Sequence, residues 1–509
     1  MLTRLGLSRH PFDRGVGLVH GGPGGWRGVR AAILGLLVVG LVGGGIATGT
    51  RWFRERAAAT GPPGMVTITS DPPGATVLVD GRVKGRTPLT LTLPGGRRRV
   101  TLRRAGDADL SRVVTVRAGR TTAVGGILWR TQPLARRVRP PLPGARIVGA
   151  DFLATGQIAL SVTLGAGSGP GDLPAAERQV WLLDAAGGAR RAGPASAHLL
   201  AAISPEGRRV AYAALPPAGG TSAAGGSQTP TLGAEPVPTE VWLAPAAGGD
   251  AGARRWALPA NTAREHLVDL AWAPDGRHLL VVTQLAAEGG QFRSRILRLD
   301  ADGHDDPREL VVLPSAIAPG SWVWRADGQL VAFLATAADR AALCLLGTGA
   351  TGVAPSLFRY LADLDPATPL APLAFAPDGT GHFVYAAASD AAATAGLFGT
   401  ATRPPGLFTA GLDAPAPARL GGQPAFWPGW RNDGLVVALA RARGDLTAVE
   451  LLDADGTATA LATLSVPFGS PGTGPAARWD AEHGRALLLA PSADGGELWL
   501  IDWREQPGQ

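Results

Sequence analysis

The chain has 509 residues, of which 45% are hydrophobic, and this is enough apolar material to build large cores. Its single cysteine, Cys344, excludes an intrachain disulfide, so we expect stability to come from packing. The net charge of +7 is uneven, because residues 1–145 carry 23 basic and 6 acidic side chains and the remainder is net acidic. Nearly all the cations are arginines, which indicates compositional bias more than nucleic-acid binding.

An uncharged apolar run at residues 31–50 follows a short tail that contains five arginines. A helix rises about 1.5 Å per residue, so a run of this length can cross a hydrocarbon core of about 30 Å. We therefore expect a transmembrane helix at residues 29–50, a cytoplasmic tail at residues 1–28 and a linker at residues 51–64, with the later domains outside the cell membrane. The alternative is a cleaved signal peptide, because three alanines follow at residues 57–59.

Residues 66–129 alternate apolar and polar side chains in short stretches that turn residues separate, which predicts a small β-sandwich at residues 65–129. The stretch SDPPGATVLVDGRVKGRTPLTLTLPGGRRRVTL resembles the PEGA domain family. The turn that names the family is Pro72, Pro73, Gly74 and Ala75 here, with Pro73 in place of the glutamate. The resemblance implies an envelope-associated module without known catalytic residues.

From residue 147 onward the chain repeats one pattern seven times: a large apolar residue, a few polar residues, a turn glycine and an apolar run. Five of the six gaps between successive turn glycines measure 50 to 55 residues; the glycines are Gly156, Gly207, Gly276, Gly328, Gly379, Gly434 and Gly484. Each unit has room for four short strands, which is typical of a β-propeller blade. We expect a seven-bladed propeller at residues 130–505, with six blades as the alternative, and a disordered insertion at residues 215–238.

The repeats resemble those of the TolB-type, WD40-like propeller family, best at ISPEGRRVAY and WAPDGRHLLVV. The resemblance implies blade geometry and leaves the ligand open.

The last repeat ends without a fourth strand. An uncovered strand edge is normally paired, and residues 134–139 (LARRVR) have the character of the missing strand. We expect this segment to pair with residues 497–502 and to close the propeller.

No catalytic, cofactor or metal site is predicted. A G-x-S-x-G nucleophile motif is absent, and the eight histidines are scattered rather than spaced as zinc ligands. The densest polar cluster, at residues 304–306 (His-Asp-Asp), has the pattern of a hairpin loop. Aspartates recur in the turns before the strands, where we expect them to stabilise the turn; they are Asp275, Asp327, Asp378 and Asp433.

These features together predict an envelope-anchored, non-catalytic binding scaffold that displays a PEGA-like domain and a propeller outside the cytoplasmic membrane. The expected partners are that membrane and an envelope protein or glycan, with no cofactor and no nucleic acid. Two alternatives stay open: an accessory or sensor subunit of a membrane signalling system, and a propeller enzyme that acts on envelope polysaccharide.

Overall fold

The computed structural model describes residues 61–504, apart from residues 165–176, 185–186, 194–197, 215–239, 249–252, 259–264, 287–291, 304–305, 338–339, 350–357, 365–370, 388–405, 413–416, 422–423, 445, 454–455, 469–475 and 491–495. The expected tail, the expected helix at residues 29–50, most of the linker and the insertion at residues 215–238 lie outside the described residues. The described chain forms two compact units. One comprises the described residues up to Thr69, Val77–Val100 and Val113–Val124, and the other comprises Ser70–Thr76, Thr101–Arg112 and everything from Gly125 onward.

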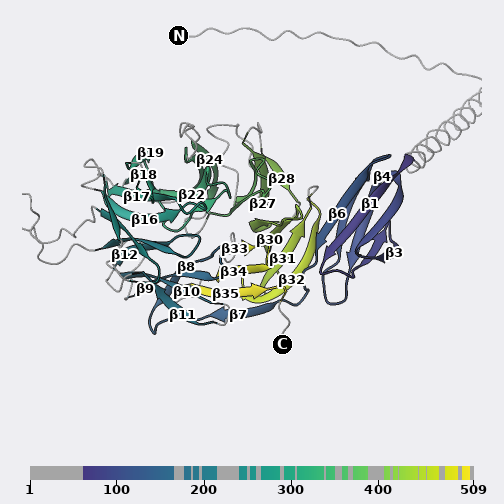
Figure 1. Cartoon of the computed structure of the whole chain (residues 1–509), viewed down its shortest axis with the longest axis horizontal. Coiled ribbons are helices and arrows are strands. Elements are labelled where there is room, and N and C mark those ends of the chain that lie inside the picture. The colour runs from purple at the N-terminus through teal and green to yellow at the C-terminus, as the bar shows by residue number, and fades with distance from the viewer. Residues whose placement is uncertain are drawn as a thin grey trace, which may run out of the picture. The chain divides into compact units, whose positions relative to one another are not determined.

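The N-terminal strands form one six-stranded sheet in the order β3-β2-β4-β1-β6, with β5 also paired to β4 (Figure 1). Its strands are β1 (Gly61–Asp71), β2 (Thr76–Val79), β3 (Arg82–Arg86), β4 (Leu89–Arg103), β5 (Leu110–Val116) and β6 (Thr121–Ile127). The β2–β3 hairpin turns at Asp80 and Gly81, whose φ angles of 48° and 79° are those of a tight turn that follows the twist of the strands.

The sequence predicted a small β-sandwich here, and the structure joins all six strands in one hydrogen-bonded sheet. The sequence pattern treats residues 94–96 (Pro-Gly-Gly) as a turn between two strands, but β4 continues through them for 15 residues. Gly95 lies opposite Gly61 in the ladder with β1. The ladder with β1 shifts its register between Gly95 and Leu93, and a proline can remain in a strand at such an irregularity, so the break expected there does not occur.

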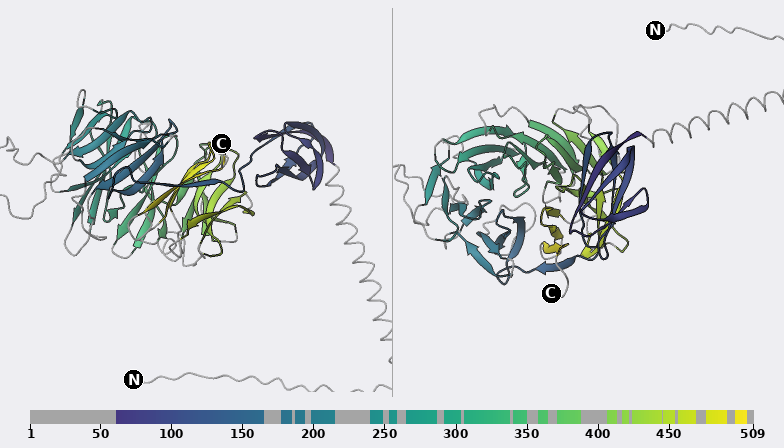
Figure 2. Two further views of the ribbon diagram at one scale, coloured as in Figure 1. Left: turned by 90° about the horizontal axis from the view of Figure 1, so that it is seen from below. Right: turned by 45° about the vertical axis from the view of Figure 1, so that its right-hand side comes forward.

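Seven further antiparallel sheets follow in chain order, and Figure 2 shows them along a ring-like path. The first three contain β8 (Arg146–Phe152), β9 (Ile158–Leu164), β10 (Glu177–Leu183) and β11 (Ala189–Ala192); β12 (His198–Ile203), β13 (Arg209–Ala214), β14 (Glu240–Pro245) and β15 (Arg254–Ala257); and β16 (His266–Trp272), β17 (His278–Ala286), β18 (Phe292–Asp300) and β19 (Arg308–Leu313). The fourth and fifth contain β20 (Ala316–Ile317), β21 (Val323–Trp324), β22 (Leu330–Ala337), β23 (Arg340–Gly347) and β24 (Phe358–Leu364); and β25 (Leu373–Phe375), β26 (His382–Ala387), β27 (Gly406–Gly411) and β28 (Ala418–Leu420). The last two contain β29 (Phe426–Trp430), β30 (Val436–Arg441), β31 (Leu446–Leu452) and β32 (Ala458–Pro467); and β33 (Ala476–Asp480), β34 (Arg485–Ala490), β35 (Glu497–Asp502) and β7 (Leu134–Val138).

Where the repeated large apolar residue is a tryptophan, it can join its sheet to the preceding one. The indole N–H of Trp272 donates to the carbonyl of Ala202 at 3.1 Å, which links the third sheet to the second. Trp479 likewise donates to the carbonyl of Trp427 at 2.8 Å, from the seventh sheet to the sixth. Each ring thus contributes buried area and satisfies its one polar group on a neighbouring backbone.

The last sheet also meets the first one. β35 pairs with β7 from Leu498 opposite Val138 to Asp502 opposite Leu134, so the predicted pairing of LARRVR is confirmed. One buried cluster combines side chains of the first sheet with side chains of the seventh; its members include Val138, Ile147, Leu160, Leu487 and Leu500. The series of sheets therefore returns to its own beginning.

The fold class expected from the sequence must be corrected. All regular structure in the described residues is β, in several small sheets of which none closes into a barrel, and no helix is present there. None of the described residues forms a helix long and apolar enough to cross a membrane. The expectation of a transmembrane helix depended on hydropathy and length alone, and these report how a segment partitions rather than its backbone conformation.

The recurrent aspartates stabilise turns, as predicted. The side chain of Asp275 accepts hydrogen bonds from the backbone N–H groups of Arg277 at 2.8 Å and His278 at 3.1 Å, and Gly276 has a φ of 63°. Equivalent backbone bonds to the residue two positions on are made by Asp327, Asp378 and Asp433.

Replacing Asp275 with asparagine is expected to remove a pH-dependent part of the free energy of unfolding. Burial alone would raise the pKa of the Asp275 carboxyl. Hydrogen bonds from the His278 side chain and from two backbone N–H groups outweigh burial and lower that pKa from 3.8 to about 2. Because the folded pKa is depressed, this stability is complete above about pH 4 and disappears as the pH falls toward 2; after allowance for solvent screening it amounts to about 1 kcal/mol.

The check is urea unfolding of both proteins between pH 6 and about pH 3, with the exposed Asp306→Asn as the control. A difference between Asp275→Asn and the wild type that does not shrink on acidification contradicts the assignment.

A candidate anion-binding pocket

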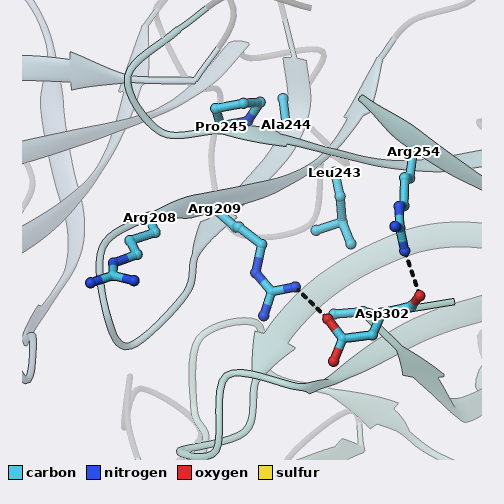
Figure 3. Close-up of a pocket in the computed structure, with 8 residues that line it drawn as sticks. Arg208, Arg209, Leu243, Ala244, Pro245, Arg254 and Asp302 are labelled. Atoms are coloured by element: carbon cyan, nitrogen blue, oxygen red, sulfur yellow. Dashed lines mark hydrogen bonds and ion pairs between the residues drawn. The ribbon is translucent and has the colours of Figure 1, made fainter. Parts of the chain in front are cut away.

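A pocket of about 540 Å³ opens where the second sheet meets the third (Figure 3). Its walls combine three arginines, one aspartate and a few small or aliphatic side chains; they are Arg208, Arg209, Leu243, Ala244, Pro245, Arg254, Ala301 and Asp302. The pocket is basic on one side and apolar on the other, as is usual for sites that bind small charged groups.

Local turn chemistry places these residues. Arg208 and Arg209 follow the turn at Gly207, whose φ is 70°, and Arg209 begins β13. Arg254 is the first residue of β15. Asp302 lies in the turn after β18, where its backbone N–H donates to the Asp300 carboxylate at 3.0 Å. Strand starts and turns therefore present all four charged groups at one end of neighbouring sheets.

Asp302 is the centre of the charged side. Arg209 donates through Nη1 to Oδ1 at 3.1 Å, and the Nε of Arg277 lies 3.4 Å from Oδ2. Arg254 donates to the backbone carbonyl of the same residue. Figure 3 shows Arg209 and Arg254 reaching Asp302 from two sides. Three guanidinium groups thus bind one aspartate, through its side chain and its backbone.

Arg209 is held rigidly in this position. Its guanidinium lies over the Trp272 ring, 5.4 Å from the centroid, and its Nε is 3.6 Å from a carboxylate oxygen of Glu206. It also donates to the carbonyl of Gly276. A planar cation fixed on an aromatic face keeps its donors in one orientation.

Arg208 differs from the other three arginines. It is exposed, it points away from Asp302 in Figure 3, and its guanidinium makes no hydrogen bond or ion pair within the part of the chain that the structure describes. Four arginines (208, 209, 254 and 277) lie close to three carboxylates (206, 300 and 302), so the local charge is about +1. Such a surface can bind an anion, and the one carboxylate in the lining, Asp302, is held by arginines.

The sequence pattern did not identify this site. Its arginines have no motif spacing, and Arg209 and Asp302 are 93 positions apart in the chain. The available signal was the two pairs of adjacent arginines, at residues 208–209 and 254–255. Arginine is so frequent in this chain that these pairs did not stand out.

The polar residues considered from the sequence do not form a metal site in the described residues. His304 and Asp305 lie outside them, and no group of three or more metal-ligating side chains is found among those described. Burial raises the pKa of the Cys344 thiol to about 12, so this cysteine stays protonated at neutral pH.

A second charged cluster is structural. Glu265 and Arg295 are 4% and 7% exposed, and their side chains approach to 3.0 Å. Thr283 donates to the same carboxylate, and Glu309 also pairs with the arginine. Removal of either buried partner would leave an uncompensated charge, so Glu265 and Arg295 hold each other in place within the third sheet.

Comparison with known families and structures identifies one domain. The PEGA domain family matches residues 64–132, which confirms the resemblance found in the sequence, and the comparison with curated proteins returns no match.

Solved structures resemble the later sheets only in fold. A puromycin-hydrolysing peptidase of Mycobacterium tuberculosis is 14% identical with a TM-score of 0.42, over 70% of this chain and 52% of its own, so the chain spans about half that enzyme. A putative TolB from Agrobacterium tumefaciens is 18% identical with a TM-score of 0.29, over 49% of this chain and 80% of its own. The Dos1 propeller is 9% identical with a TM-score of 0.39, over 74% and 96%. These are propeller-like neighbours, and their activities are not transferred to this chain.

Proposed function

We propose that this protein is a non-catalytic binding scaffold and that the pocket between the second and third sheets holds an anionic group of its ligand. The observation that carries the proposal is the convergence of three arginines on one pocket, with one of them, Arg208, unpaired among the described residues. The PEGA domain and the propeller-like series of sheets are consistent with a role in binding.

The arginine side chains suit this role better than a general positive surface does. Residues 146–509 are net acidic, so a local charge of about +1 contrasts with its surroundings and attracts an anion to this position. The guanidinium group offers parallel N–H donors that match the two oxygens of a carboxylate or a phosphate. Leu243 and Pro245 provide an apolar wall beside these donors, which lowers the competition from water.

The experiment measures binding of two labelled probes of equal charge, an oligo-aspartate and an oligogalacturonate, by fluorescence anisotropy at low salt. Replacing Arg208 and Arg254 together with glutamine is expected to weaken binding about tenfold or more, because two charge-assisted contacts are lost. Raising the salt concentration is expected to weaken wild-type binding as well.

The matched control is Arg255→Gln. Arg255 follows Arg254 on the same strand, but it pairs with Glu240 at 3.5 Å and lies 5.9 Å from the centroid of Trp242, away from the pocket. The control removes one positive charge from the same strand, so it should keep affinity within about twofold. Equal losses in the control and in the double variant would show that net charge, not the pocket, binds the probe.

A further inference from the structure

The pocket already contains a peptide carboxylate that belongs to the chain itself. Asp302 occupies the position between Arg209 and Arg277 with its side chain, while Arg254 holds its backbone carbonyl. This is how an arginine cluster would grip an aspartate of another protein: two guanidinium groups on the carboxylate and a third on the adjacent peptide oxygen.

The chemistry of these contacts separates the classes of acidic ligand. A uronic acid or a phosphate offers oxyanions but has no amide carbonyl next to them. The Arg254 donor is already placed on a backbone carbonyl, and this favours a peptide. An aspartate-bearing segment would satisfy the same three arginines that Asp302 satisfies now.

On the basis of the proposed function, we propose that Asp302 is an internal pseudo-ligand and that the pocket binds an aspartate-rich segment of a partner protein, which displaces both the side chain and the backbone carbonyl of Asp302 from the three arginines. Exchange is feasible because the Asp302 side chain is 37% exposed and its ion pairs face solvent, where each is worth little. Arg208 then supplies a contact that Asp302 does not use, and the pocket has room for further side chains of the incoming segment.

While Asp302 occupies the pocket, a partner can bind only the molecules whose pocket is open. The apparent affinity is therefore the intrinsic affinity multiplied by the open fraction. Removing the charge of Asp302 should therefore tighten binding of the acidic peptide. The test compares Asp302→Asn with Glu240→Gln, which removes one carboxylate from the neighbouring strand β14, outside the pocket lining. Both variants gain the same net charge, so their difference reports on the pocket.

Asp302→Asn is expected to bind the labelled oligo-aspartate about fivefold tighter than Glu240→Gln does. Asp302→Ser, which cannot reproduce the shape of the carboxylate, should show the same gain, and thermal melting of each variant checks that it is folded. Affinity equal to that of Glu240→Gln in both variants, or weaker, would mean that Asp302 merely orders the arginines and would overturn the inference.

The remaining outcomes separate this inference from the proposed function. Tighter binding of oligogalacturonate than of oligo-aspartate would exclude a peptide ligand and leave the pocket as an anion site. If both probes bind the double variant Arg208→Gln/Arg254→Gln as tightly as the wild type, the proposed function is wrong and the inference fails with it. Loss of binding in that arginine variant without a gain in Asp302→Asn would overturn the pseudo-ligand alone.

Discussion

Replacing Val138 with aspartate is expected to lower the free energy of unfolding of the sheets by about 3–5 kcal/mol. Val138 is 8% exposed and lies opposite Leu498 in the pairing of β7 with β35. Its side chain belongs to the cluster that the first and seventh sheets share, together with Ile147 and Leu160. A carboxylate there would be buried without a cationic partner and would separate the strand from the core. The edge of β35 would then be open for pairing with other chains.

The measurement is thermal and urea unfolding followed by tryptophan fluorescence. The control is Arg136→Asp, which introduces the same side chain on the same strand at an exposed position, so it also controls for the poor strand propensity of aspartate. The control should cost less than about 1 kcal/mol. If both variants are equally stable, β7 does not close the series of sheets. Aggregation of Val138→Asp at its unfolding midpoint would agree with an exposed edge.

The β7 pairing could be predicted because local and global requirements coincide. The seventh repeat contains three strands, and residues 134–139 had the position and character of the fourth. The turn aspartates were equally accessible, because the hydrogen bonds of Asp275 reach only three residues along the chain. Features determined within a few residues, or by the count of repeated units, can be read from a pattern.

The candidate pocket could not be predicted in this way. Arg209 and Asp302 meet through the packing of two sheets, and the strand pairing within each sheet does not fix that approach. β4 shows a related limit, because residues 94–96 have turn residues but remain in a strand when the neighbouring strands continue beside them. Tertiary context overrides propensity at such points.

Some contacts that hold adjacent sheets together also escape a sequence reading, and Asp269 is the clearest of these. It lies on β16, is 6% exposed, and accepts hydrogen bonds from the Gly320 backbone at 2.6 Å and the Trp322 indole at 2.7 Å. Trp322 in turn packs against Phe333, with ring centroids 5.2 Å apart. One carboxylate therefore links the third sheet to the fourth, although nothing in its sequence surroundings distinguishes it.

Replacing Asp269 with alanine is expected to lower the free energy of unfolding by about 2–4 kcal/mol, because the buried Trp322 indole and the part-buried Gly320 backbone N–H would lose their acceptor. Burial raises the pKa of Asp269, which shows that its charge is costly where it lies, so part of the loss is offset when the charge is removed. Asp269→Asn keeps one acceptor oxygen without the charge and should fall between alanine and the wild type.

Urea unfolding at pH 7 tests this order, with the exposed Asp306→Ala as the control for removal of one carboxylate. The wild type and the control should unfold at the same urea concentration, Asp269→Asn at a lower one and Asp269→Ala at the lowest. An alanine variant as stable as the wild type would mean that relief of the buried charge equals the loss of both hydrogen bonds, and the contact would then fix only the register between the sheets.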